Sequence, residues 1–200
     1  MNYKENKIEE FLEKLSSTSS MPGGGVAASL VGANAVSLAL KVCNLSLGKE
    51  RYKEYESLIK ESKVKLEESR KNFLSFMDQD AKDFKAMEEV YAMPKTTDEE
   101  KEERKKALEN ACKVCCQTPA EVIKEVVAAS EIARKLVGKT SISAASDLKI
   151  ALQFFLVTIH SAWENIEINL KYIKDEEFKK PFIKMKEQIE ALADNIDKNT

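Results

Sequence analysis

The stretch Met21-Pro22-Gly23-Gly24-Gly25-Val26-Ala27-Ala28 decides the fold of this chain. Pro22 fixes its own φ, and the glycines that follow leave the backbone without Cβ atoms. Small residues then recur at helical spacing as far as Cys43, so the sequence predicts a helix over Gly25–Ser46 with a narrow face. Because this helix is apolar nearly all round, we expect it to be central in a helical bundle.

The glycines permit two interpretations. They let a second helix pack closely, or they let a ligand reach the free N–H groups and the positive dipole end of the helix. A carboxylate, another anion or a carbonyl would suit such a helix start. A nucleotide-binding P-loop is not supported, because no Gly-Lys-Ser/Thr sequence ends the stretch and no strand precedes it.

A second apolar helix is predicted over Leu148–Tyr172. Its later half carries a polar line at steps of three and four residues, formed by Thr158, Ser161, Asn165 and Asn169. Polar side chains on an interior helix need hydrogen-bond partners, which either a neighbouring helix or a ligand can supply. His160 lies off this line and has no acidic or thiol neighbour in a motif, so we assign it no catalytic role.

From Lys49 to Ala92 the chain has no proline or glycine, and apolar residues recur every three or four positions. One long helix is the simplest interpretation, and a break within it is the alternative. Asp80 occupies a position on the apolar stripe. A carboxylate there loses hydration unless something pairs with it, so Asp80 is either a salt-bridge partner at a gap in the packing or a functional group.

The remaining segments also have helical signatures. Asn2–Leu15 is predicted to be an amphipathic helix, Thr97 opens a capping box, and Pro181–Ile196 is a last amphipathic helix. Thr118 and Pro119 are predicted as the cap and first residue of another helix. No strand is predicted. We therefore expect an all-α helical bundle with two buried central helices surrounded by amphipathic helices, as one domain over residues 1–200.

Composition limits the partners. The 200-residue chain has a net charge of −2 from 32 basic and 34 acidic side chains, so no summed field favours nucleic acid or an anionic membrane. Met21–Leu40 has the length of a membrane span but few bulky aliphatic residues, and we interpret it as a core helix. No signal-peptide pattern opens the chain, so a cytoplasmic location is expected. The 4 cysteines are expected as buried thiols, because a single Cys-x-x-Cys has too few ligands for structural zinc.

Several motifs resemble the formiminotetrahydrofolate cyclodeaminase and methenyltetrahydrofolate cyclohydrolase family. The resemblance runs in order from Phe11 to Ile173, and its most specific parts are the glycine run and the late Asn165-Ile-Glu-Ile-Asn169. The other matching motifs are Leu45-Ser-Leu-Gly-Lys49, Gln79-Asp80-Ala81, Ala92-Met-Pro-Lys95 and Ser146-Asp147-Leu148.

The resemblance implies an enzyme whose substrate is a tetrahydrofolate derivative that carries a one-carbon unit at N5 or between N5 and N10. We expect a cyclodeaminase, which converts 5-formimino-tetrahydrofolate into 5,10-methenyl-tetrahydrofolate and ammonia, with a role in histidine degradation. A cyclohydrolase, in which water opens the methenyl bridge to give 10-formyl-tetrahydrofolate, is the alternative. The resemblance also implies a homodimer. A separate formiminotransferase is a candidate partner that the sequence does not decide, and no metal, nucleic acid or membrane is expected as a partner.

Asp80 and Asp147 are the candidate catalytic residues, because desolvation raises the pKa of a carboxyl toward neutrality, where it can shuttle a proton or orient the pterin. The amides of Asn165 and Asn169 can read pterin edges. The N–H groups of the glycine run suit the carbonyl or the glutamate carboxylate of the ligand, and Lys49 can pair with that carboxylate. The candidate substrate-binding residues are Pro22, Gly23, Gly24, Gly25, Lys49, Asn165 and Asn169.

Two positions depart from the family pattern. Val26 stands where the family usually has Ser, and Ser46 stands where it usually has Thr. The missing hydroxyl at position 26 removes a helix cap or a ligand contact, so either the backbone carries that role or this member has altered activity. The departure keeps open a catalytically silent helical module that binds folate or dimerises, and a plain coiled-coil scaffold is a third alternative.

Overall fold

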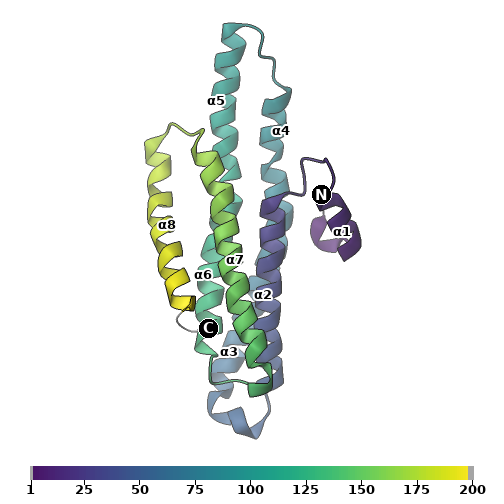
Figure 1. Ribbon diagram of the computed structural model, residues 1–200, viewed down its shortest axis with the longest axis vertical. Coiled ribbons are helices and arrows are strands. Elements are labelled where there is room, and N and C mark those ends of the chain that lie inside the picture. The colour runs from purple at the N-terminus through teal and green to yellow at the C-terminus, as the bar shows by residue number, and fades with distance from the viewer. Residues whose placement is uncertain (1, 198–200) are drawn as a thin grey trace.

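The computed structural model describes residues 2–197, and the regular structure within this range is entirely helical. Figure 1 shows an elongated bundle in which the α4–α5 pair projects at one end. The predicted all-α fold is confirmed. The elements are η1 (Tyr3–Glu5), α1 (Ile8–Leu15), α2 (Gly24–Ser46), η2 (Glu50–Tyr55), α3 (Glu56–Asp83), α4 (Lys85–Ala92), α5 (Asp98–Cys115), α6 (Gln117–Lys135), η3 (Ile142–Ala144), α7 (Ala145–Leu170) and α8 (Glu176–Asp197).

Helices α2 and α7 form the centre of the bundle and lie side by side (Figure 1). They are antiparallel, because Gly24 at the start of α2 faces Asn165 near the end of α7, while Lys41 pairs with Asp147 at the opposite ends. Helix α3 packs against α2, and α6 packs against α7. The two predicted central helices are confirmed, and small residues allow the close packing: a Cβ on Gly32 would lie 2.6 Å from the Phe73 ring.

The outer side of the α2–α7 pair is less covered than the sequence suggests. Within α7, Ile150, Val157 and Ile168 are 39%, 52% and 58% exposed. Helix α2 and the segment Ile142–Leu170 are each long and apolar enough to cross a membrane by length and composition. The apolar stretch of α2 is 61% buried inside the bundle, whereas that of Ile142–Leu170 is only 39% buried. Helix α7 therefore carries exposed apolar side chains along one side, because residues 150, 157 and 168 are spaced by close to whole turns of the helix.

Two helices predicted as continuous are interrupted. The Lys49–Ala92 segment begins with the turns of η2, continues as α3, and breaks at Phe84 before α4. The expected helix over Asn2–Leu15 is divided into η1 and α1, because the backbone at Asn6 is extended. Of the apolar side of α1, Phe11 is buried, whereas Ile8 is 81% exposed.

Only some of the helices begin at the capping residues that the sequence predicts. Thr97 caps α5 in the predicted capping box. The predicted cap role of Thr118 is wrong: α6 already begins at Gln117, and the buried Thr118 hydroxyl instead donates a hydrogen bond of 2.5 Å to Asp83 Oδ2. The last helix begins at Glu176 and not at Pro181, because the Asp175 carboxylate accepts a hydrogen bond of 3.0 Å from the Phe178 N–H and so caps the first turn.

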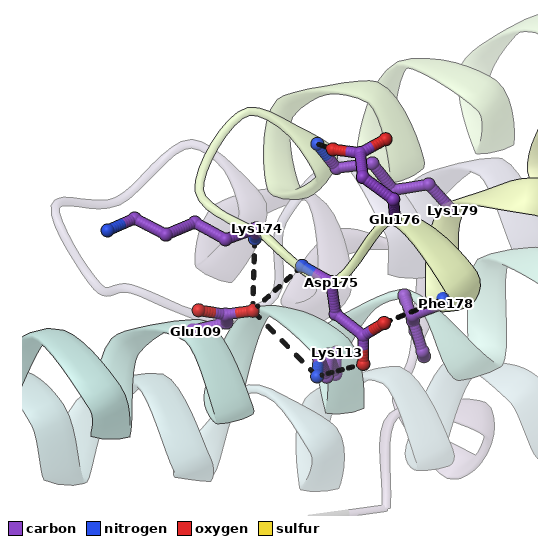
Figure 2. A network of polar contacts seen from close by, with 7 residues as sticks. All are labelled: Glu109, Lys113, Lys174, Asp175, Glu176, Phe178 and Lys179. Carbon is purple, nitrogen blue, oxygen red and sulfur yellow. Dashed lines mark hydrogen bonds and ion pairs between the residues drawn. The ribbon is translucent and has the colours of Figure 1, made fainter.

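A polar cluster formed by Glu109, Lys113 and Asp175 attaches the turn before α8 to α5 (Figure 2). The Glu109 carboxylate accepts hydrogen bonds from the N–H groups of Lys174 and Asp175 at 3.0 and 3.2 Å. The Lys113 ammonium pairs with Asp175 at 2.8 Å and with Glu109 at 3.8 Å. The cluster therefore fixes the direction in which α8 leaves the turn and returns along the bundle.

Candidate functional site

A cavity of about 430 Å³ opens at the start of α2. It lies between the end of α3, α4, α5 and the end of α7, so residues from distant parts of the chain share its wall. Asp80 and Arg104 are the charged side chains that line it. The lining residues are Ser20, Met21, Gly23, Gly24, Gly25, Asp80, Phe84, Met87, Tyr91, Arg104, Leu108, Cys112, Cys115, Asn165, Ile168, Asn169 and Tyr172.

Asp80 lies against the first turn of α2, and this contact explains the glycine at position 25. A Cβ on Gly25 would overlap both oxygens of the Asp80 carboxylate, so no side chain fits at this position. The Val26 N–H donates a hydrogen bond to the Asp80 carboxylate. Helix α2 has no side-chain cap of its own, so a carboxylate from α3 takes the place of the cap at its positive end.

The environment of Asp80 raises its pKa from 3.8 to about 6. Burial is the main cause, and the nearby Asp83 carboxylate adds to it, while the hydrogen bond from Val26 acts in the opposite direction. Asp83 itself is buried and accepts hydrogen bonds from Thr118 and Gln79. A carboxyl in this position can gain and lose a proton near neutral pH, as general acid–base chemistry requires.

Asn165 and Asn169 present amide oxygens to the same cavity. Each amide nitrogen donates a hydrogen bond of 2.7 Å to a backbone carbonyl of its own helix, that of Ser161 or Asn165. Among the residues that the structure describes, neither amide oxygen has a hydrogen-bond partner. Thr158 bonds in the same way to the Phe154 carbonyl, so the polar line of α7 does not pair with neighbouring helices. The two amides are available to a ligand that donates hydrogen bonds.

The two departures at positions 26 and 46 have structural explanations. The Val26 side chain is fully buried in an apolar cluster with Tyr3, Phe11 and Met77, away from the cavity. Its backbone N–H makes the contact to Asp80, so the backbone carries the role that a hydroxyl would have at this helix start. The Ser46 hydroxyl donates to the Val42 carbonyl and accepts from the Ser141 N–H, so it holds a distant loop.

The structure brings most of the predicted site residues together but not all. Gly23, Gly24 and Gly25 line the cavity with Asp80, Asn165 and Asn169, whereas Pro22 is buried just outside it. Asp147 lies at the opposite end of α7, about 27 Å along the helix from Asn165, and pairs with Lys41 at 2.9 Å. Lys49 follows the end of α2, so it also lies at that opposite end.

The residues of α4 and α5 that line the cavity were not predicted from the sequence as site residues. Arg104 lies in a segment so dense in charge that its sequence favours a solvated helix face, yet it lines the cavity together with Leu108 and Tyr91. The available signal is its spacing: Arg104, Leu108 and Cys112 recur every four residues and share one helix face.

The cavity cysteines are thiols and not nucleophiles. All 4 cysteines of the chain are unpaired. Burial raises the pKa of Cys115 to about 12 and also raises that of Cys112, so both stay protonated near neutral pH. Among the side chains that the structure describes, no group of His, Cys, Asp and Glu is arranged to hold a metal ion.

The fold and cavity define a class: an all-helical protein with a cavity of about 430 Å³, lined by a carboxyl of raised pKa and by two asparagine amides. The comparisons with known proteins give this class a family. The family model described as Formiminotransferase-cyclodeaminase matches residues 7–191. The chain therefore belongs to this family.

Relatives of the chain have names from folate chemistry. A methenyltetrahydrofolate cyclohydrolase of Methylorubrum extorquens is 33% identical over 93% of this chain and 89% of its own length. The formimidoyltransferase-cyclodeaminase of Gallus gallus is 26% identical over 84% of this chain, which spans 31% of that relative. The crystal structure of formiminotetrahydrofolate cyclodeaminase from Thermotoga maritima matches with a TM-score of 0.84 at 27% identity, covering 96% of this chain and 92% of that one.

Proposed function

We propose that this enzyme is a formiminotetrahydrofolate cyclodeaminase, which converts 5-formimino-tetrahydrofolate into 5,10-methenyl-tetrahydrofolate and ammonia. The observation that carries the proposal is the Asp80 carboxyl, held at one end of the cavity with its pKa raised to about 6. Membership of a family whose relatives are named as folate cyclodeaminases and cyclohydrolases supports an enzyme acting on folate C–N bonds.

The charge of Asp80 suits the proposed substrate and product. A protonated formimino group and a methenyl bridge are both cations, with the charge spread over the reacting carbon and its nitrogens. Asp80 is the acidic side chain that lines the cavity, so its carboxylate stabilises a cation placed there. The free amide oxygens of Asn165 and Asn169 can accept hydrogen bonds from the pterin amino group or ring N–H.

A single carboxyl can perform both proton transfers of the reaction. N10 attacks the formimino carbon, and the Asp80 carboxylate removes the N10 proton as the tetrahedral carbon forms. The protonated Asp80 then gives that proton to the amino group on the same carbon. The C–N bond breaks, ammonia leaves, and Asp80 returns to its ionised form. A carboxyl with a pKa of about 6 is suited to both steps near neutral pH.

A methenyltetrahydrofolate cyclohydrolase is the second candidate, because the Methylorubrum extorquens relative with that name is 33% identical over 89% of its length. In this reaction water attacks the methenyl carbon while Asp80 removes a proton. The proton then passes to N5 as the N5–C bond breaks, and Asp80, ionised again, takes the remaining hydroxyl proton and passes it to solvent, which leaves the formyl group on N10. The same cavity serves both reactions, since each passes through a tetrahedral carbon between N5 and N10.

The experiment follows methenyl absorbance and ammonia release after purified protein is mixed with 5-formimino-tetrahydrofolate, and 10-formyl-tetrahydrofolate formation from the methenyl compound in parallel. Deamination supports the first candidate, and turnover of the methenyl compound alone supports the second. Because the ionised form of Asp80 begins either reaction, we expect kcat/KM to rise with pH through an apparent pKa of about 6. Asp80→Asn should remove this dependence and lower kcat by at least about 100-fold. Full activity of Asp80→Asn would contradict the assignment.

The proposal includes a homodimer formed through the side of α7 on which Ile150, Val157 and Ile168 are exposed. Val157 is 52% exposed and lies about midway along α7 between Asp147 and Asn165. A twofold axis near this residue places the Asp147 end of a second copy beside the cavity of the first. Such an arrangement gives Lys49 and Asp147 a role across the interface, since within one chain they are too far from Asp80 to act on the same ligand.

A further inference from the structure

The cavity has two chemically different ends, because two rows of side chains line its length. On α3 and α4 the row is Asp80, Phe84, Met87 and Tyr91, and on α5 it is Cys115, Cys112, Leu108 and Arg104. The two rows are antiparallel in sequence, because Cys115 contacts the Asp83 carbonyl at 3.7 Å and Arg104 donates to the Val90 carbonyl at 3.2 Å. Asp80 and Arg104 therefore mark opposite ends of the cavity.

The two ends are separated by an apolar middle. Eleven residues of helix from Asp80 to Tyr91 correspond to about 16 Å. Phe84, Met87 and Leu108 line the part between the charged groups. A ligand that fills this cavity is therefore elongated, with a polar or cationic group at the Asp80 end, an apolar middle and an anion at the Arg104 end.

Arg104 is set up to bind an anion that the protein does not itself provide. Its Nε donates to the Val90 carbonyl, which holds the guanidinium in place, and no carboxylate among the described side chains lies within ion-pair distance of it. Its neighbours differ, because Lys101 pairs with Asp98 and Lys105 pairs with Glu102. A half-buried, oriented guanidinium with free N–H groups matches the geometry of a carboxylate.

We propose that Arg104 binds the glutamate carboxylate of the folate substrate and so determines which way the ligand lies in the cavity. The inference rests on the proposed function, since a folate has its glutamate at the end opposite the pterin ring, with a benzoyl group between. Arg104 then holds the glutamate, the apolar middle receives the benzoyl ring, and N5 and N10 lie toward Asp80. Arg104 is a specificity-determining residue that is remote from the reacting carbon.

The test compares two stable compounds by calorimetry: 5-formyl-tetrahydrofolate and the primary amide of 5-formyl-tetrahydropteroic acid, in which an uncharged carboxamide stands where the glutamate is attached. We expect Arg104→Gln to weaken binding of the first by about 10- to 100-fold and to leave binding of the second unchanged. Arg104→Lys should recover part of the loss. Lys105→Gln is the matched control, because Lys105 does not line the cavity, and it should bind both compounds as the wild type does.

Two other outcomes would overturn either the role of Arg104 alone or the proposed function as well. Equal loss of both compounds in Arg104→Gln, or no loss of either, overturns the role of Arg104 while the proposed function stands. Wild-type protein that binds neither compound overturns the proposed function and this inference with it. Thermal unfolding of each variant separates a lost contact from a misfolded chain, since Arg104 has a single hydrogen bond to the protein among the described residues.

Discussion

At the scale of single residues, the contact between Gly25 and Asp80 connects stability with chemistry. The structure places a carboxylate at the start of α2, where the positive end of the helix favours it, but also among apolar groups, where loss of hydration opposes it. The second effect is larger, because the pKa of Asp80 is raised and not lowered. The residue that gives the cavity its proton donor and acceptor therefore destabilises the folded chain.

Asp80→Asn should stabilise the protein at pH 8 while it removes most of the activity. Because the folded state holds the Asp80 proton where the unfolded chain has released it, the free energy of unfolding falls as the pH rises from about 4 to about 6. A shift from 3.8 to about 6 corresponds to a gain of about 2–3 kcal/mol for the variant at pH 8 and almost none at pH 4. Urea unfolding at both pH values measures this. Asp147→Asn, which loses a pair with Lys41, is the control and should not gain stability.

Gly25→Ala should destabilise the chain by about 1–3 kcal/mol, because its Cβ overlaps the Asp80 carboxylate and must displace either the carboxyl or the start of α2. Gly24→Ala is the matched control, since its Cβ would meet the Asn165 amide at an ordinary 3.8 Å. Adding Asp80→Ala to Gly25→Ala should restore most of the loss. Thermal unfolding of the single and double variants gives the coupling between the two positions, and additive losses would argue against the contact.

At the scale of helices, local sequence signals and contacts between helices share the control of where helices start. The capping box at Thr97 operates within its own chain segment. The start of α8 depends on a contact outside its segment, because Asp175 both caps the first turn and pairs with Lys113 on α5 (Figure 2). This pairing lowers the pKa of Asp175, so its stabilising effect is present above pH 3.8 and is lost as the pH falls below that value.

Asp175→Ala should loosen α8 without unfolding the bundle. It removes the cap of α8 and the partner of Lys113, so amide hydrogen exchange should become faster in α8 and in the turn before it, and not in α2 or α7. Asp175→Asn keeps a capping side chain and removes the charge, so its effect should be intermediate. Glu177→Gln, which removes an exposed pair with Lys180, is the control. Unchanged exchange in α8 of Asp175→Ala would show that the cluster does not hold this helix.

At the scale of the whole molecule, the exposed face of α7 connects the proposed dimer with the position of the cavity. The two central helices contain the long apolar stretches of the described residues, yet only 39% of the apolar stretch within Ile142–Leu170 is buried inside the bundle. Exposed apolar side chains on a central helix are the feature on which the proposed dimer rests. The cavity opens beside one end of this face, where α2 starts and α7 ends.

Val157→Asp should convert the proposed homodimer into monomers, because it places a charge at the middle of the exposed face of α7. Sedimentation velocity measures the change, and activity should fall with dimer content if Lys49 and Asp147 act across the interface. Val64→Asp is the matched control: Val64 is a valine on α3 that is 67% exposed, and its replacement should leave the oligomeric state unchanged. A wild-type protein that sediments as a monomer at assay concentration contradicts the proposed dimer.

The sequence alone was sufficient for the features that local periodicity controls. The spacing of apolar and small residues predicted the two central helices, and the position of Asp80 on an apolar stripe distinguished it from the other carboxylates of its helix. The capping box was also predictable, because its donors and acceptors lie within four residues of one another. These features depend on helix geometry, which is the same wherever a helix is placed.

The tertiary structure decided which of these residues meet. Antiparallel packing of α3 and of α7 against α2 brings Gly25, Asp80 and Asn165 to one cavity and carries Lys49 and Asp147 to the opposite end. It also places Arg104 of a densely charged helix inside that cavity and directs Thr118 to Asp83 and not to its own helix start. Periodicity defines the face of a helix on which a residue lies, but only packing against other helices determines what that face contacts.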